Sequence, residues 1–199
     1  MPSPRTLTIV PIAHTQADLG TLAPSAAHAP GAADRTAVVS ALWAAIEHWA
    51  QNTLLTAQSS RHVILQDGLP IDADVQRLVA EVAAAGSRNH ALLLRLMQAG
   101  HTVLGTESPE LLIEELNLAR RLAADPALAA DPRIVTRRRA LLEMRDRFIA
   151  DRAAAVITDH TPGVLFIGAA HDVASILARS SPDIAVARPA LACAPTKAA

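Results

Sequence analysis

Short apolar runs alternate along the chain with longer segments that carry apolar residues at helical spacing. The runs are residues 6–13, 62–65, 101–105, 163–168 and 183–186. They are brief and rich in Val and Ile, which is typical of buried strands. Near-continuous apolar strands between helices indicate a parallel sheet that is covered on both faces. The sequence therefore predicts a three-layer α/β fold with a mostly parallel sheet of about four to five strands covered by helices. A mainly helical protein with few strands is the alternative.

The segments between the apolar runs predict helices, because their apolar positions recur every three or four residues. Ser108 and Pro109 are typical of the first positions of a helix, and Asp131-Pro132 begins the longest one. Residues 66–70 (QDGLP) predict a turn after the second strand. The predicted helices are residues 37–57, 72–84, 89–98, 109–123 and 131–158, with a short helix that ends near residue 179.

The length of 199 residues predicts one domain, placed at residues 1–187. Residues 21–36 contain Pro, Gly and small residues without periodicity, and they predict a flexible loop or lid. Residues 188–199 predict a mobile C-terminal tail. A chain of this size can bury a core without disulfides, and its 51% apolar content fits that expectation.

Composition excludes several classes of function. The net charge is −1 and the charges are mixed along the chain except at Arg137-Arg138-Arg139, so we expect no nucleic-acid partner. Cys193 is the only cysteine, which excludes an intramolecular disulfide and a zinc site built from several cysteines. We find neither a signal-peptide pattern nor an apolar run of about 20 residues. We therefore expect a cytoplasmic protein with no membrane partner.

Ionisable residues follow four of the predicted strands, where open α/β sheets bind their ligands. These residues are His14, Asp67, Glu107 and His171. Two imidazoles and two carboxylates together suit a divalent transition metal such as Mn, Zn, Co or Fe. Without a metal, His14 or His171 could act as a general base on water. The structural alternative is that Asp67 forms a turn and that Glu107 lies at the N-terminus of the following helix.

Helical phase adds further candidates. Arg145 falls on the apolar face of the helix predicted at residues 131–158, and an Arg there needs an anionic partner or must extend to water. It could pair with Glu107 or stabilise a developing oxyanion, so we count it among the catalytic candidates. Glu115 borders the apolar stripe of its own helix and could be a second carboxylate in the cleft or a partner of Arg145. Asp172, Glu115 and Asp18 are the candidates for substrate binding.

Nucleotide-binding and serine-hydrolase signatures are missing. The segment 163–171 (GVLFIGAAH) has neither the GxGxxG spacing nor the Lys-Ser/Thr of a phosphate-binding loop. The sequence contains no GxSxG nucleophile elbow.

Several short motifs occur together in a characteristic order. A helix that carries Arg145-Asp146-Arg147 precedes an apolar strand that leads into Gly168-x-x-His171, while His14 follows the first strand and Glu107 the third. In these pieces the chain resembles the superfamily of TraB-type and Tiki proteins, which includes ChaN haem-binding lipoproteins and erythromycin esterases. Tiki-like members are metal-dependent proteases, the esterases are hydrolases, and ChaN-like members bind haem. The resemblance implies a site at the strand ends, and either hydrolysis or haem binding.

These observations favour a hydrolase-like enzyme that acts on a small molecule or a short peptide. His14, Glu107 and His171 would hold a metal or activate water, with help from Asp67. The first alternative is a metal- or haem-binding protein without turnover. The second is a structural or oligomerisation module, since the Ala- and Leu-rich helices could bury a homodimer interface.

Overall fold

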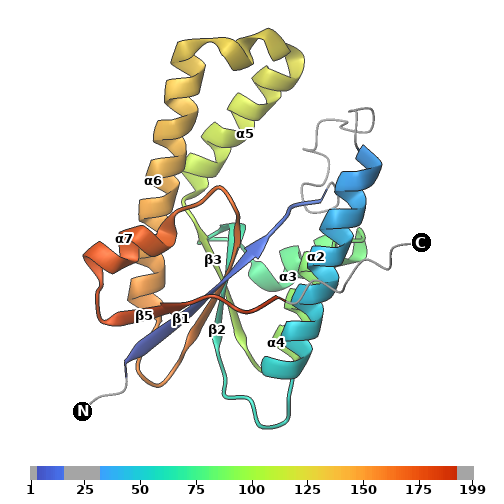
Figure 1. Cartoon of the computed structure of the whole chain (residues 1–199), viewed down its shortest axis with the longest axis vertical. Helices are drawn as coiled ribbons and strands as arrows, with labels where there is room; N and C mark the ends of the chain where they lie inside the picture. Colours follow the sequence, from blue (N-terminus) through green and yellow to red (C-terminus); the bar gives the residue numbers. More distant parts are fainter. Residues whose placement is uncertain (1–3, 16–31, 192–199) are drawn as a thin grey trace.

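The computed structural model describes residues 4–15 and 32–191, and it confirms the predicted α/β class. A five-stranded sheet has the order β3-β2-β4-β1-β5, and all of its strand pairs are parallel (Figure 1). The strands are β1 (Arg5–Ile12), β2 (Val63–Pro70), β3 (Thr102–Glu107), β4 (Gly163–Gly168) and β5 (Ile184–Ala187). Their carboxyl ends therefore meet at one edge of the sheet.

Helices cover both faces of the sheet, as the apolar strands predict. On one face, Trp43, Ile46 and Leu92 of the helices pack with Ile64 and Phe166 of the sheet in one buried cluster. On the other face, helices α6 and α7 close a second cluster. The helices are α2 (Ala32–Thr53), α3 (Val75–Ala84), α4 (Arg88–Gln98), α5 (Pro109–Ala124), α6 (Pro132–Val156) and α7 (Val173–Ser180), with a 3₁₀ turn η2 (Pro126–Ala130).

The start signals of the predicted helices are confirmed. The Ser108 side chain accepts a hydrogen bond from the backbone N–H of Leu111, and that of Asp131 accepts one from Arg133. Both residues satisfy donors that a helix N-terminus otherwise leaves unpaired. None of the described helices is both long enough and apolar enough to cross a membrane.

The turn predicted at residues 66–70 was wrong, because β2 continues through this segment to Pro70. The pairing of β2 with β3 shifts register between Gln66 and Pro70, which is the signature of a β-bulge. Gly68 has a φ of 80° within the bulge, a conformation that glycine adopts without a steric penalty. Asp67 consequently projects from the sheet itself and not from a loop beyond it.

The prediction of a loop over residues 21–36 was wrong at its C-terminal end, because α2 already begins at Ala32. Residues 16–31, with Asp18 and the rest of the proposed lid, lie outside the described residues. In the predicted tail, Leu191 packs against the cluster on the α2 side of the sheet. The tail from residue 192 onward also lies outside the described residues.

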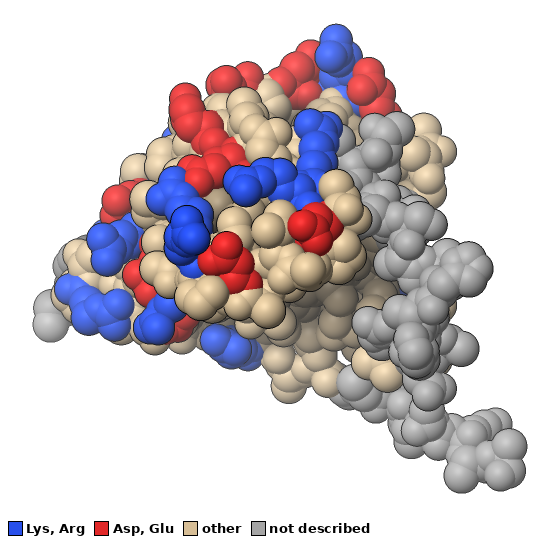
Figure 2. Space-filling view, turned by 90° about the horizontal axis from the view of Figure 1, so that it is seen from above, with Lys and Arg blue, Asp and Glu red and all other residues tan. Residues whose placement is uncertain are grey.

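Helices α5 and α6 extend past the strand ends as a hairpin (Figure 1). The 25 residues of α6 span about 37 Å, whereas the 6 residues of β4 span about 20 Å. We call the projecting part, residues 109–142, the arm. Its buried side chains are Leu118 and Leu141. Viewed from above, acidic and basic side chains are interspersed on this side of the molecule (Figure 2).

Candidate functional site

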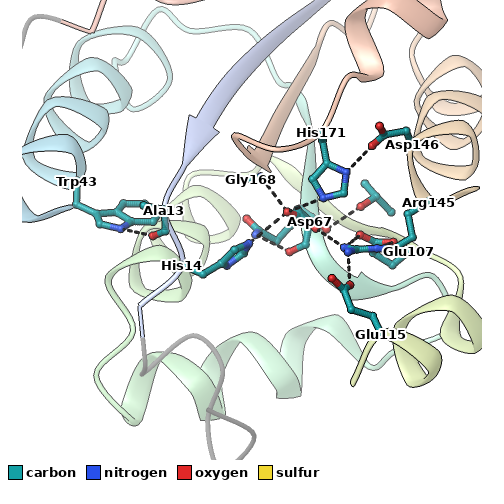
Figure 3. Close-up of polar contacts among 12 residues, drawn as sticks. Ala13, His14, Trp43, Asp67, Glu107, Glu115, Arg145, Asp146, Gly168 and His171 are labelled. Atoms are coloured by element: carbon teal, nitrogen blue, oxygen red, sulfur yellow. Dashed lines mark hydrogen bonds and ion pairs between the residues drawn. The ribbon is translucent and has the colours of Figure 1, made fainter. Parts of the chain in front are cut away.

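The four ionisable residues predicted at the strand ends lie in one cluster (Figure 3). His14 follows the end of β1, Asp67 lies in the bulge of β2, and Glu107 is the last residue of β3. His171 follows β4, just before α7. The parallel strands bring together residues that are more than 150 positions apart in the sequence, from His14 to His171.

Asp67 is the centre of the cluster. Its Oδ2 accepts a hydrogen bond of 2.9 Å from the backbone N–H of Gly168. The same oxygen lies 3.2 Å from Nε2 of His14 and 3.6 Å from Nε2 of His171. The side chain of His14 is 32% exposed, whereas that of His171 is 6% exposed. Two imidazoles therefore converge on one buried carboxylate oxygen, and the His14 side of the cluster is open to solvent.

The guanidinium group of Arg145 donates hydrogen bonds to three carboxylates. Its Nη2 donates to Asp67 Oδ1 at 3.0 Å and to Glu107 Oε1 at 2.5 Å, and its Nε donates to Glu107 Oε2 at 3.1 Å. Its Nη1 donates to Glu115. Within the described residues, carboxylates thus occupy four of the five guanidinium N–H groups. The structure brings Arg145 to both of the partners considered for it, but its donors are engaged, which argues against an oxyanion-binding role.

Asp146 contacts Nδ1 of His171, the ring nitrogen that does not face Asp67. Its Oδ1 lies 2.5 Å from His171 Nδ1, and its Oδ2 accepts a 3.0 Å hydrogen bond from the backbone N–H of Asp172. Because an ionised carboxylate can only accept, His171 Nδ1 carries a proton when Asp146 is ionised. This contact fixes the ring so that Nε2 points toward Asp67.

Gly168 and Trp43 shape the space around the cluster. A Cβ at Gly168 would lie 3.2 Å from Asp67 Oδ2, 3.7 Å from His171 Cδ2 and 3.8 Å from His14 Nε2. Glycine therefore leaves room for the imidazoles and lets the backbone N–H approach the carboxylate. On the opposite side, Trp43 Nε1 donates to the carbonyl oxygen of Ala13 at 3.0 Å and anchors the chain next to His14.

Burial and charge shift the protonation of the cluster. Burial by itself raises the pKa of Asp67, but the hydrogen bond with His14 and the charge of His171 outweigh it and hold this pKa well below its usual range. Burial raises the pKa of Glu107 to about 7, although Arg145 opposes the shift. For His171, burial lowers the pKa, but the hydrogen bond to Asp146 and the charge of Asp67 outweigh it and raise the pKa above its usual value. Asp67 is thus the anionic centre near neutral pH.

Asp67, Glu107 and His171 could hold a metal ion, since each offers a ligand atom within 4.8 Å of the others. Both oxygens of Glu107, however, already accept hydrogen bonds from Arg145. Two ligands of a tetrahedral ion lie roughly 3.4 Å apart, close to the separations of 3.2 and 3.6 Å between Asp67 Oδ2 and the Nε2 atoms of His14 and His171. His14 is therefore a further donor next to Asp67, whereas the three donors that all lie close to one another are those of Asp67, Glu107 and His171.

The other predicted site residues have different roles. Asp172 caps α7, because its side chain accepts a hydrogen bond from the backbone N–H of Ser175. This contact gives Asp172 a structural role at the N-terminus of α7. Glu115 contacts Arg145 and is 47% exposed at the rim of the cluster.

Sequence reasoning missed the roles of Asp146 and Gly168, although both residues belong to the motifs that carry the resemblance. The available signal for Asp146 was its helical position next to Arg145, on a face that also buries Ile149 and Ala150. A buried Asp requires a partner, just as a buried Arg does.

The chain matches no family model, curated protein or solved structure. What the fold and the cluster define is an α/β protein with a histidine–carboxylate site at the carboxyl ends of a parallel sheet.

Proposed function

We propose that the protein is a hydrolase that activates water at His14, Asp67 and His171 and acts on a small molecule or a short peptide. The observation that carries the proposal is the convergence of two imidazole Nε2 atoms on the single oxygen Asp67 Oδ2. This convergence lies at the edge of the sheet where α/β proteins bind their ligands. The resemblance to Tiki-like proteases and erythromycin esterases supports the same class of reaction.

We propose that Asp67, Glu107 and His171, with His14 as a further donor beside Asp67, hold a divalent transition metal. A bound metal lowers the pKa of its water toward neutrality and polarises a carbonyl group. Asp146 supports such a site, because it keeps the proton on His171 Nδ1 and leaves Nε2 as the ligand atom. Mn, Zn, Co and Fe all accept this donor set.

The remaining residues have supporting roles in the proposed reaction. Arg145 neutralises Asp67 and Glu107 and fixes the orientation of both carboxylates. If the protein works without a metal, His14 is the better general base, because its more exposed ring can reach a water molecule. Asp67 then orients the His14 ring.

Metal content and hydrolysis test the proposal together. The protein, purified without a His tag, is analysed by mass spectrometry for metals and assayed on a panel of p-nitrophenyl esters and fluorogenic peptides. We expect a bound transition metal and measurable hydrolysis, both lost in the double variant His14→Ala/His171→Ala. The matched control is His48→Ala/His160→Ala, which removes two exposed histidines and should change neither readout.

Three outcomes separate the alternatives. If hydrolysis occurs without a bound metal and is still lost in the double variant, the result supports His-assisted catalysis and excludes a metal from the mechanism. A bound metal, or a Soret band on titration with haem, without hydrolysis of any probe favours a binding protein without turnover. Hydrolysis that survives in the double variant overturns the proposed site.

A further inference from the structure

Two consecutive carbonyl groups at the start of the β2 bulge accept hydrogen bonds from buried side chains. The carbonyl oxygen of Gln66 accepts one of 2.9 Å from Thr106 Oγ1, on the neighbouring strand β3. The carbonyl oxygen of Asp67 accepts one of 2.7 Å from Nε2 of the Gln66 side chain. Gln66 and Thr106 are both fully buried, and we call this pair of side chains the brace. The brace therefore holds both of the peptide groups that flank the Cα of Asp67.

The bulge explains why these carbonyl groups need side-chain partners. A bulge disrupts the hydrogen-bond ladder of a sheet, and a buried carbonyl group must then find a donor elsewhere. Strand β3 lies very close to the bulge, because a Cβ at Gly105 would lie 2.1 Å from the carbonyl oxygen of Pro70. Glycine at position 105 thus permits this close approach, and the next residue, Thr106, reaches the carbonyl oxygen of Gln66.

The other end of the Gln66 amide shows which of its atoms matters. Its Oε1 is buried and has no hydrogen-bond partner in the part of the chain that the structure describes. A buried acceptor without a partner destabilises the folded state. A methionine of similar length would fill the same space without an unpaired oxygen. What Gln66 contributes at this position is therefore the Nε2 donor that holds the Asp67 carbonyl group.

The backbone at Asp67 determines where its carboxylate lies, because the two flanking peptide groups set the direction of the Cα–Cβ bond. In the observed orientation Asp67 Oδ2 accepts a 2.9 Å hydrogen bond from the backbone N–H of Gly168 and lies 3.2 Å from His14 Nε2 (Figure 3). Groups that act on a substrate must be held within about 0.5 Å of their working positions. Gln66 and Thr106 contact the backbone of β2, so they act on the cluster through Asp67.

We propose that Gln66 is a positioning residue whose side-chain amide, with help from Thr106, holds the Asp67 carboxylate toward the two imidazoles of the cluster. The inference deepens the proposed function, and it rests on that function only for the statement that this arrangement serves a reaction. The role predicts that loss of the Gln66 donor disturbs the contacts of Asp67 while the surrounding sheet stays folded.

Hydrogen exchange of the Gly168 amide tests the inference, because this N–H donates directly to Asp67 Oδ2. The rates are measured by NMR on the full-length protein. In Gln66→Met the exchange of Gly168 should be about tenfold or more faster than in the wild type, because a hydrogen bond to a charged group is weakened. The amide of Leu165, on the same strand as Gly168, should keep its rate. Ile64→Met, a buried change on the same face of β2, is the matched control and should leave both rates unchanged.

Thr106→Val provides a second variant, because it removes the hydroxyl donor at nearly the same volume. It should accelerate the exchange of Gly168 selectively and by a smaller factor, and it decides by the same criteria if Gln66→Met does not fold. Unchanged exchange of Gly168 in Gln66→Met, or equal acceleration of Gly168 and Leu165, overturns the positioning role. A selective effect in Gln66→Met alone supports the role of Gln66 and removes Thr106 from the brace.

The readout requires neither a metal nor turnover, so it separates this inference from the proposed function. Selective acceleration at Gly168, together with no hydrolysis of any probe, supports the positioning of Asp67 and overturns only the hydrolase. Hydrolysis that is lost in His14→Ala/His171→Ala, together with unchanged exchange of Gly168 in Gln66→Met, overturns only the positioning role.

Discussion

At the scale of single residues, the site depends on charges that are buried in pairs. Asp67, Glu107 and Arg145 have side chains that are at most 7% exposed, so each of them would be costly to bury alone. Arg145 makes this burial possible because its planar guanidinium reaches both carboxylates at once. The cation is therefore a structural requirement for burying the two carboxylates, whereas His14 and His171 hold the pKa of Asp67 low.

Replacing Arg145 should reveal this requirement. We expect Arg145→Met to lower the free energy of unfolding by roughly 3–5 kcal/mol, because it leaves buried carboxylates without a partner. Arg147→Met, two positions further along the same helix at an exposed position, should change it by less than about 0.5 kcal/mol. Urea unfolding of both variants measures the difference. Equal stability of the two variants would contradict the role assigned to Arg145.

The contact between Asp146 and His171 predicts a change in protonation. Asp146→Asn removes the negative charge next to Nδ1, so the pKa of His171 should fall below its wild-type value. NMR titration of the histidine rings in the metal-free protein measures this pKa directly. Asp151→Asn, an exposed change on the same helix, is the control and should leave the titration of His171 unchanged. A shift of equal size in both variants would show that Asp146 acts only through the net charge.

At the scale of elements, the bulge of β2 determines where the central carboxylate lies. The register shift between Gln66 and Pro70 lets Asp67 accept hydrogen bonds from both Gly168 and Arg145. The positive φ of Gly68 makes this bend possible at low energy. The end of β2 and the position of the central carboxylate are thus specified by the same few residues.

Substitutions at Gly68 should separate backbone conformation from side-chain bulk. Among the described residues other than its two chain neighbours, none has an atom within 4 Å of the Cβ position at Gly68, so the expected effect is conformational. Gly68→Ala should lower the free energy of unfolding by about 1–2 kcal/mol, because an L-residue with a Cβ is disfavoured at positive φ. Gly68→Asn should lower it less, since Asn tolerates this conformation better. Thermal unfolding of the two variants measures both effects, and a larger loss in Gly68→Asn would contradict the conformational argument.

At the scale of the whole molecule, the cluster couples global stability to pH. Between its usual value of 4.5 and its raised value of about 7, Glu107 holds a proton in the folded chain that the unfolded chain releases. Stability therefore falls as the pH rises through this window. His171 adds to this loss of stability. Because its pKa is raised in the folded protein, its contribution is lost as the pH rises from 6.5, the usual pKa of histidine, through the pKa of His171 in the folded protein. The lowered pKa of Asp67 acts in the opposite direction, so its contribution is lost in strong acid, below its usual value of 3.8.

Glu107→Gln tests this coupling. The metal-free wild-type protein should lose stability between about pH 5 and about pH 8, and the variant should lose less over the same range. The comparison uses the change between the two pH values, so that a uniform destabilisation of the variant cancels. Urea unfolding at both pH values provides the measurement. An identical change in the two proteins would show that Glu107 does not titrate in this range.

The sequence by itself determined the local structure and the edge of the sheet at which chemistry is concentrated. Strand and helix preferences depend on neighbouring residues, so the apolar runs and the Ser108 and Asp131 caps were readable in advance. The parallel order of the strands follows from their alternation with helices. From it, His14, Asp67, Glu107 and His171 could be assigned to one edge.

Only the tertiary structure decided which charges are paired. Arg145 reaches Asp67 across 78 positions of the chain, and Glu107 and Glu115 across 38 and 30. Helical phase named Glu107 and Glu115 as candidate partners of Arg145, but the contact with Asp67 depends on the packing of α6 against the sheet and was not readable in advance. The structure thereby placed Arg145 among the carboxylates and Asp146 behind His171, and it left the two imidazoles facing Asp67. The physical reason is that burying a charge requires an exact partner in space, whereas forming a strand or a helix requires only suitable neighbours in sequence.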